Sequence, residues 1–267
     1  MLYFRGERSR LERLATEPVI ALVGSRRASP YGREVAHSLA RELVACGTVV
    51  VSGLAFGVDS AAHEGALDGG GLTVAVLGGG ADVPYPRSNR GLYKRIATDG
   101  LIVSEMPPGL VPRRWCFPAR NRIMAALAVM TVVVEGTDRS GSLITARFAT
   151  DLGREVGAVP GQVTSTLAHG PNALLADGAC VIRSASDVLD AIYGPGSLEA
   201  RAAIAKAELQ LDDQQRLLLE AVEQGRGSPD LIVSASDQVG SALAGLTELE
   251  MMGLIRREPD GRYTRCA

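Results

Sequence analysis

Short apolar runs that do not alternate with polar residues recur along most of this chain, and they constrain its fold more than any other feature. The runs lie at residues 19–23, 48–51, 73–77, 101–103, 131–134, 155–159 and 179–182. Continuous runs rich in Val, Ile and Ala indicate strands buried on both faces, as in a parallel sheet that helices cover. Segments with helical character separate them, at residues 31–46, 59–67, 89–98, 120–128 and 143–152. The alternation predicts an α/β fold with an extended Rossmann-like, doubly wound, mainly parallel sheet.

The character of the sequence changes after Ile192. Residues 194–211, which begin with Gly-Pro-Gly-Ser and continue rich in alanine, are expected to form a linker. A capped helix is expected from Asp212 to about residue 224, a second helix at 238–252 with Gly253 as its terminator, and a β-hairpin around Asp260-Gly261. We therefore expect two domains, a Rossmann-like one at residues 1–193 and a small winged-helix-like module at 212–267.

The charges of this C-terminal module argue against duplex DNA as its ligand. Residues 212–254 carry eight acidic side chains and two basic ones, and the presumed recognition helix at 237–252 has no Lys or Arg. A helix in the major groove needs cations for the phosphates and donors for the base edges. The module is therefore interpreted as a protein-interaction surface, while the hairpin arginines leave a minor contact with DNA open.

Net charge and cysteine usage exclude several classes of protein. The formal net charge is −2, so any basic surface has to be local. The four cysteines are scattered, without a C-x-x-C pair, which favours a reducing cytoplasm and argues against a zinc site. No run of about 18 apolar residues predicts a membrane span, and the charged N-terminus lacks the apolar core of a signal peptide.

Small residues follow three of the predicted strands, in Gly24-Ser25-Arg26, Ser52-Gly53 and Gly78-Gly79-Gly80. The carboxyl ends of parallel strands meet at one edge of the sheet, where such folds bind ligands. Gly24 permits close approach to the backbone and Arg26 offers a bidentate cation, although an ordinary strand-to-helix turn is the alternative. The dinucleotide fingerprint G-x-G-x-x-G is absent after the first strand, and Pro84 breaks the helix that should follow the triple glycine. No cofactor is therefore expected.

Residues 115–145 combine the groups that a nucleic-acid site requires. Phe117 precedes a basic Arg120-Asn121-Arg122 cluster at a predicted helix start, and Ser140-Gly141-Ser142 opens another helix. Free N–H groups at a helix start attract an anion, and arginines beside an aromatic ring suit a polyanion with flat bases. The wider tract 87–122 carries eight basic and two acidic residues. A solvated helix face accounts well for the basic residues at 90–95. It accounts less well for Arg113, Arg114 and Arg120, which are expected in a Pro-bounded loop.

The candidate catalytic groups have simpler structural interpretations. His63 is interpreted as a residue that packs against a neighbouring loop, and Glu135 as a structural or arginine-orienting carboxylate. Cys116 has no obvious base in its neighbourhood. The patterns G-x-S-x-G, H-E-x-x-H and G-x-x-x-x-G-K-S/T are absent. No catalytic residue and no metal ligand is therefore expected.

Ordered motifs over residues 2–181 make the sequence resemble the DNA-processing protein A family (DprA, also called Smf), which serves natural transformation. The matching strings lie at residues 23–26, 29–32, 51–59, 62–63, 76–86, 104–109, 117–123, 134–135, 140–146 and 159–161. The resemblance implies a Rossmann-like protein that binds single-stranded DNA, forms a homodimer and loads a RecA-type recombinase, without catalytic turnover. Two departures stand out. Met106 occupies a position where an aromatic residue is common, and this sequence starts almost at the sheet, as a truncated or naturally short form without the N-terminal helical domain of many members.

By motif, the resemblance implies that Arg26 and the Ser140-Gly141-Ser142 turn hold phosphates, that Arg114 is the basic residue before the aromatic one, and that Phe117 stacks a base. The expected DNA-binding residues are Gly24, Ser25, Arg26, Ser52, Gly53, Arg113, Arg114, Phe117, Arg120, Asn121, Arg122, Ser140, Gly141, Ser142 and Thr145.

Two other functions stay open on the same sheet: a nucleotide-processing enzyme similar to phosphoribohydrolases, and a nucleotide-sensing scaffold. Such phosphoribohydrolases carry P-G-G-x-G-T with a downstream catalytic Glu. Here the equivalent turn at 135–142 is followed by Leu-Ile-Thr, without an acid. The sequence therefore disfavours the enzyme.

Overall fold

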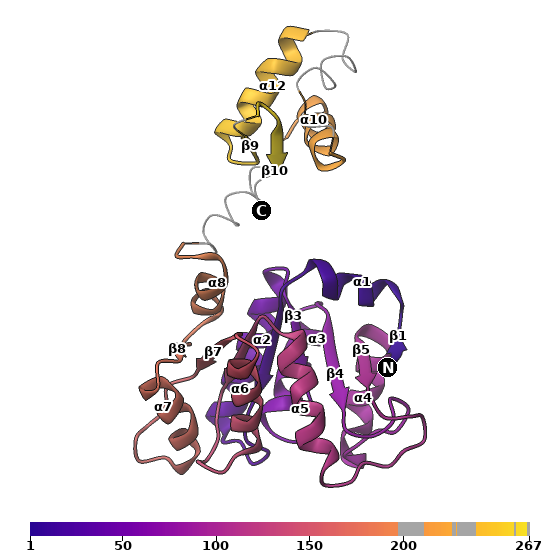
Figure 1. Ribbon diagram of the computed structural model, residues 1–267, viewed down its shortest axis with the longest axis vertical. Coiled ribbons are helices and arrows are strands. Elements are labelled where there is room, and N and C mark those ends of the chain that lie inside the picture. Colours follow the sequence, from indigo (N-terminus) through magenta and orange to yellow (C-terminus); the bar gives the residue numbers. More distant parts are fainter. Residues whose placement is uncertain (197–210, 226–227, 229–238, 259, 266–267) are drawn as a thin grey trace. The chain divides into compact units, whose positions relative to one another are not determined.

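One eight-stranded sheet forms the centre of the first part of the protein (Figure 1). The computed structural model describes residues 1–196, 211–225, 228, 239–258 and 260–265, and the chain divides into two compact units, Met1–Pro195 and Gly196–Ala267. The strands of the sheet are β1 (Tyr3–Gly6), β2 (Val19–Val23), β3 (Val49–Ser52), β4 (Thr73–Leu77), β5 (Leu101–Ser104), β6 (Met130–Val133), β7 (Glu155–Ala158) and β8 (Cys180–Val181). Their order is β1-β5-β4-β3-β2-β6-β7-β8, and neighbours are parallel except for β1 with β5. The predicted α/β class and mainly parallel sheet are confirmed.

The strands that were predicted from continuous apolar runs are all present, within a residue or two of their expected bounds. Strand β1 was not predicted. It pairs antiparallel with β5, with Tyr3 opposite Ser104 and Gly6 opposite Leu101. Its Tyr-Phe-Arg-Gly sequence is only partly buried and contains no continuous apolar run, so the pairing partner rather than the local pattern makes it a strand.

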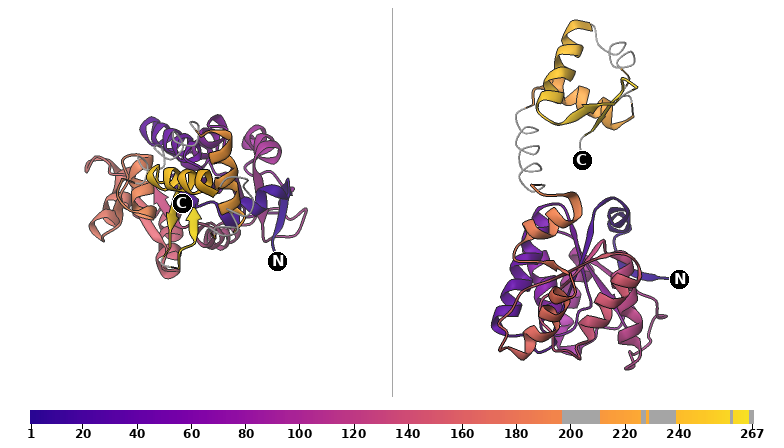
Figure 2. Two further views of the ribbon diagram at one scale, coloured as in Figure 1. Left: turned by 90° about the horizontal axis from the view of Figure 1, so that it is seen from above. Right: turned by 60° about the vertical axis from the view of Figure 1, so that its left-hand side comes forward.

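Helices cover both faces of the sheet (Figure 2). One face carries α2 (Pro30–Ala45), α3 (Val58–Asp68), α4 (Arg90–Asp99) and α8 (Ala185–Tyr193); the other carries α1 (Ser9–Thr16), α5 (Cys116–Leu127), α6 (Gly141–Asp151) and α7 (His169–Ala176). Two 3-10 turns, η1 (Arg87–Asn89) and η2 (Thr166–Ala168), precede α4 and α7. Because residues alternate across a strand, Ile20 and Leu22 of β2 pack with the first set of helices and Ala21 with the second. None of the described helices is long and apolar enough to cross a membrane.

Helix α5 begins at Cys116, four residues before its predicted start at Arg120. Pro118 does not prevent this, because it lies in the first turn, where a helical N–H has no partner within the helix. As a result Phe117 lies on the first turn of α5, and the Arg120-Asn121-Arg122 cluster lies inside the helix rather than at its start or in the preceding loop. Helices α1, α7 and α8 lie outside the predicted helical segments.

The order of the strands reverses beside β2. From β2 the chain moves outward through β3, β4 and β5, and then returns to place β6 on the other side of β2. The crevice at the carboxyl ends of β2 and β6 is therefore the topological switch point, where open α/β sheets bind their ligands. The loops that follow these two strands, residues 24–29 and 134–140, border this crevice.

The second unit contains two described helices and a hairpin. Helix α10 (Asp213–Glu223) starts with a capping box, in which the Gln215 N–H donates to Asp212 Oδ1 at 2.7 Å and the Asp212 N–H donates to Gln215 Oε1 at 3.0 Å. Helix α12 (Val239–Met251) is followed by Gly253 at a φ of +73°, and β9 (Ile255–Arg257) pairs antiparallel with β10 (Tyr263–Arg265). The expected capped helix and hairpin are confirmed. The winged-helix topology stays a prediction, because residues 226–227 and 229–238, like most of the expected linker, lie outside the described residues.

Candidate nucleic-acid interface

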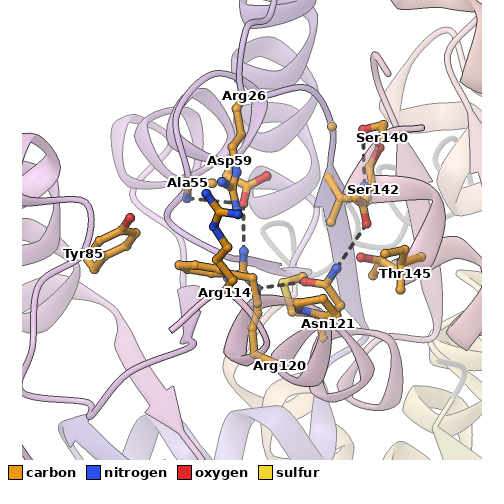
Figure 3. Close-up of a pocket in the computed structure, with 17 residues that line it drawn as sticks. Arg26, Ala55, Asp59, Tyr85, Arg114, Arg120, Asn121, Ser140, Ser142 and Thr145 are labelled. Carbon is orange, nitrogen blue, oxygen red and sulfur yellow. Dashed lines mark hydrogen bonds and ion pairs between the residues drawn. The ribbon is translucent and has the colours of Figure 1, made fainter. Parts of the chain in front are cut away.

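A pocket of about 570 Å³ lies at the switch point of the sheet. Its walls come from the loop after β2, the start of α3, the first turns of α5 and α6, and the loops that contain Ala55, Tyr85 and Arg114. Figure 3 shows Ser140 and Ser142 on one side of the pocket, Tyr85 on the opposite side, and Arg26 and Arg114 between them. The pocket therefore has two chemically different ends.

The start of helix α6 forms the polar end. Ser140 is the N-cap: its Oγ accepts a hydrogen bond from the Ser142 N–H at 3.4 Å and lies 2.7 Å from Ser142 Oγ. A Cβ added to Gly141 would meet no atom within 4 Å, so this side of the turn is open. Thr145 Oγ1 is buried and has no hydrogen-bond partner among the described residues. Helix N–H groups next to hydroxyls are suited to an oxyanion such as a phosphate.

Arg26 and Arg114 bring exposed positive charge to the middle of the pocket. Arg26 follows β2, and its guanidinium carbon lies 5.0 Å from the centroid of the Phe117 ring, within the range of a cation–π contact. Arg122, by contrast, is paired on the surface with Glu105 at 2.5 Å and does not line the pocket. The two pocket arginines are thus placed to contact an anion in the cavity.

Phe117 and Tyr85 form the aromatic end. Their ring centroids are 5.4 Å apart and the ring planes are tilted by 37°. Phe117 is half-buried on the first turn of α5, whereas Tyr85 is 43% exposed. Exposed aromatic faces beside a cation are suited to flat bases, which stack on them without a requirement for sequence.

Arg120 forms part of the floor instead of reaching outward. It is only 7% exposed; its Nη1 donates to the Val76 carbonyl at 2.6 Å, and its Nη2 lies 3.6 Å from Asp59 Oδ2. Burial raises the pKa of Asp59, against the opposing effect of the Arg120 charge, and burial also lowers the pKa of Arg120. A side chain on Gly53 would collide with the Arg120 guanidinium, so a larger residue there would force that buried group to move.

Asn121 joins the two helices that border the pocket. Its Oδ1 accepts from Arg120 Nε at 2.9 Å and its Nδ2 donates to the Gly141 carbonyl at 3.1 Å. The side chain therefore holds the first turn of α6 against α5. Arg120 and Asn121 line the cavity, yet both already have partners within the protein.

The structure brings ten of the fifteen sequence-predicted DNA-binding residues to the pocket: Gly24, Arg26, Arg114, Phe117, Arg120, Asn121, Ser140, Gly141, Ser142 and Thr145. The other five lie around it. Ser25 Oγ accepts from the Arg27 N–H at 3.1 Å, Ser52 Oγ donates to the Leu22 carbonyl at 2.7 Å, and Arg113 is exposed outside the lining. Gly53 lies below Arg120 and Arg122 pairs with Glu105, as described above. The roles of all fifteen residues in binding DNA stay predictions.

Seven lining residues were missed from the predicted set, and two of them, Tyr85 and Asp59, carry side chains with functional chemistry. Tyr85 was noted only as one aromatic residue within the basic tract, and its contact with Phe117 depends on how two distant segments meet. Asp59 was noted in the sequence only as part of the matching string at residues 51–59. Nothing in the local sequence indicates that its carboxylate faces the buried Arg120. The repeated aromatic residues of 85–117 were the one available signal for Tyr85.

His63 packs against a loop, as predicted. The Leu54 N–H donates to His63 Nε2 at 3.3 Å, and His63 Nδ1 lies 2.7 Å from Thr73 Oγ1, which donates to the Val50 carbonyl at 3.0 Å. Complete burial, followed by the charge of Arg120, lowers the pKa of His63 to about 3. The ring is therefore neutral, with its proton on Nδ1, and it supports the loop after β3.

Glu135 is a structural carboxylate. It accepts from the Ser29 N–H at 2.8 Å and from Ser29 Oγ at 2.6 Å, and Ser29 in turn caps α2 by accepting from the Gly32 N–H at 3.0 Å. The end of β6 is thereby tied to the start of α2, across the switch point. The structural interpretation of Glu135 is confirmed, since its contacts are with Ser29 rather than with an arginine.

Comparison with known proteins shows which family this chain is similar to. The model of the family described as DNA recombination-mediator protein A matches residues 1–193. A Mycobacterium tuberculosis protein named as a DNA processing protein, DprA, is 41% identical over 96% of this chain and 66% of its own length. The chain thus spans about two thirds of the length of that relative.

Two solved structures agree in fold. DNA processing protein A of Streptococcus pneumoniae superposes with a TM-score of 0.66 at 43% identity, covering 70% of this chain and 65% of its own. DNA processing protein A of Helicobacter pylori, whose structure was described for its single-stranded DNA binding mode, gives a TM-score of 0.65 at 33% identity, covering 72% of this chain and 86% of its own.

Proposed function

The chain belongs to the DNA recombination-mediator protein A family, and from this premise we propose that its Rossmann-like unit binds single-stranded DNA in the pocket at the switch point. The observation that carries the proposal is the pairing of a polar helix start with an aromatic end, with two exposed arginines between them. A nucleotide offers matching groups, a phosphate and a flat base. The Helicobacter pylori relative, which binds single-stranded DNA, supports the same assignment.

Contacts to the phosphates would hold a single DNA strand in the pocket. A backbone phosphate on the Ser140-Gly141-Ser142 turn accepts hydrogen bonds from the N–H groups of α6 and from the hydroxyls, while Arg26 and Arg114 neutralise neighbouring phosphates. These contacts carry no sequence information. Binding is therefore expected to tolerate most sequences and to weaken as salt rises.

The aromatic end favours single strands over duplex. A base reaches the half-buried face of Phe117 only when it is unstacked from its neighbours and free of a pairing partner. In a duplex that release has an energetic cost, which single strands largely avoid. We therefore infer a preference for single-stranded DNA of otherwise equal length and charge.

Binding without turnover is the proposed chemistry. Glu135, the acid that best suits catalysis in this architecture, is engaged with Ser29, and Asp59 faces Arg120 on the pocket floor. The rival functions, a nucleotide-processing enzyme or a nucleotide-sensing scaffold, predict tight binding of a mononucleotide, and the enzyme also predicts release of its base. Titration with AMP, followed by chromatography for free adenine, separates these outcomes from the proposed one.

We extend the proposal to the role named by the family description, recombination mediation. The protein would act in the cytoplasm as a homodimer, protect DNA taken up during natural transformation, and load a RecA-type recombinase onto it. Two pockets on one strand would raise the effective concentration of the second contact. Recombinase filament assembly on a coated strand, measured with and without the protein, tests the loading step.

The central experiment is a fluorescence-anisotropy titration with a single strand, the matching duplex and AMP. Wild type should prefer the single strand, and Arg26→Ala combined with Phe117→Ala should abolish most of that affinity. Arg41→Ala, an exposed arginine of α2 outside the pocket lining, serves as the matched control and should bind as wild type. Arg114→Ala alone should reduce the slope of log affinity against log salt by about 0.7, the value for one phosphate contact on single strands. Equal binding of duplex and single strand, or no oligonucleotide binding, would contradict the proposal.

A further inference from the structure

A second, smaller cavity adjoins the pocket. We call it the apolar niche; it has a volume of about 60 Å³, against about 570 Å³ for the pocket. The residues that line the niche alone include Phe56, Leu77, Gly78, Pro86 and Pro112. They belong to the end of β4, to the loops after β3 and β4, and to the loop before α5. Hydrophobic and glycine residues thus make up most of its own wall.

The niche and the pocket share a wall. Arg26, Ala55, Tyr85, Phe117 and Arg120 line both cavities. Tyr85 and Phe117 are the two aromatic residues whose ring centroids are 5.4 Å apart, and Figure 3 places Tyr85 at the end of the pocket opposite the Ser140-Gly141-Ser142 turn. The niche therefore adjoins the aromatic end of the pocket and lies away from its polar end.

Phe56 has no role in the protein core that would explain its position. It is 46% exposed at the loop that leads into α3, and it lines the niche together with Tyr85, which is 43% exposed. Exposed aromatic residues that converge on an apolar cavity indicate a ligand with an apolar surface. Because this cavity adjoins a cationic pocket, the occupant that fits both is a flat base attached to a negatively charged backbone.

We propose that the apolar niche is a second base site, which receives an unstacked base of the same strand whose phosphate contacts the Ser140-Gly141-Ser142 turn. This inference rests on the proposed single-strand binding. The lining is mainly apolar, so the niche discriminates by size more than by hydrogen bonds to base edges. The smaller single ring of a pyrimidine enters such a cavity more readily than the fused rings of a purine.

The test compares Phe56→Ala with Phe4→Ala. Phe4 is 45% exposed on β1 and lines neither cavity, so it matches Phe56 in residue type and exposure. Affinity is measured for a thymine homopolymer and for a strand of equal length built from abasic residues. Phe56→Ala should weaken binding of the thymine strand by about 5-fold or more and leave the abasic strand unchanged, while Phe4→Ala binds both as wild type does.

Three results would overturn the inference. The first is thymine-strand affinity that is the same for Phe56→Ala and Phe4→Ala. The second is an equal loss on both strands, which would indicate a backbone effect. The third concerns one thymine or one adenine placed in the abasic strand: thymine should raise wild-type affinity more than adenine, and an equal gain contradicts the size preference.

Failure of the underlying function looks different. If the proposed single-strand binding were wrong, wild type would bind neither strand and Arg26→Ala would change nothing. If only the niche were wrong, wild type would bind both strands, Arg26→Ala would weaken both, and Phe56→Ala would match its control. Thermal unfolding of both phenylalanine variants verifies that each is folded.

Discussion

At the scale of single residues, two arginines that lie close together in the sequence differ in their exposure. Arg114 is exposed at the pocket, whereas Arg120, six positions later, is buried and donates to the Val76 carbonyl. The difference arises because α5 carries Arg120 across the ends of β3 and β4, where Gly53 leaves room for a guanidinium. The space that Gly53 leaves thus allows Arg120 to form part of the pocket floor instead of pointing into the pocket.

Gly53→Ala should therefore destabilise the protein. The added methyl group collides with Arg120 and either displaces it or strains the loop, at a cost of about 1–3 kcal/mol in the free energy of unfolding. Urea denaturation measures the change. Gly141→Ala is the matched control, because its Cβ would enter open space, and its stability should equal or slightly exceed that of wild type. Equal stabilities of the two variants would show that the Arg120 packing is not required.

His63 should make stability depend on pH. Its pKa in the folded protein is lowered to about 3, whereas the unfolded chain has a value near 6.5, so the unfolded state binds more protons between these values. The His63 contribution is complete above about pH 6.5 and is lost as pH falls toward 3. His63→Gln should flatten the pH dependence of the free energy of unfolding in this range. His169→Gln, an exposed histidine, is the control, and an identical profile for both variants would contradict the prediction.

At the scale of elements, the start of α2 depends on a contact across the switch point. The Ser29 hydroxyl caps the helix by accepting a hydrogen bond from the Gly32 N–H. The same hydroxyl donates a hydrogen bond to Glu135 after the end of β6. Ser-Pro before an apolar-periodic segment is a recognisable helix start. The carboxylate that holds it is 106 residues away in the sequence and becomes a neighbour only because β6 lies beside β2.

Ser29→Ala should lower the free energy of unfolding by about 1–2 kcal/mol, since it removes the cap and leaves Glu135 without its shortest hydrogen bond. Ser38→Ala removes a hydroxyl of the same helix whose one hydrogen bond among the described residues is to exposed Glu42, and it should change stability far less. Chemical denaturation of both variants provides the comparison. If Ser38→Ala lowered the free energy of unfolding as much as Ser29→Ala, the contact between Ser29 and Glu135 would add no stability beyond that of an ordinary surface hydrogen bond.

At the scale of the whole molecule, the chain has two units with separate cores. Val, Ala, Leu and Ile residues on both faces of the sheet fill the first, and Leu218, Leu246 and Leu254 belong to the second. Every residue that lines the pocket lies in Met1–Pro195. Stability of the second unit and affinity of the pocket should therefore vary independently.

Leu246→Ala in the intact protein tests this independence. Loss of a fully buried leucine should destabilise the second unit by about 2–5 kcal/mol, while single-strand affinity stays at the wild-type value. Leu43→Ala, at an equally buried position under the sheet, should lower the stability of the first unit instead. Hydrogen exchange locates each loss and anisotropy reports affinity. A fall in affinity for Leu246→Ala would mean that the second unit contributes to binding.

The sequence alone determined the seven strands with continuous apolar runs, the capped helix start at Asp212, and the edge of the sheet that carries the site. Continuous Val-rich runs require burial on both faces, and capping residues satisfy N–H groups within their own turn, so both signals are local. The tertiary structure alone decided which groups face the cavity. It buried Arg120, paired Arg122 with Glu105, and brought Tyr85 against Phe117. These contacts join segments that only the crossovers of the chain bring together, and no local pattern encodes which distant partner fills a given space.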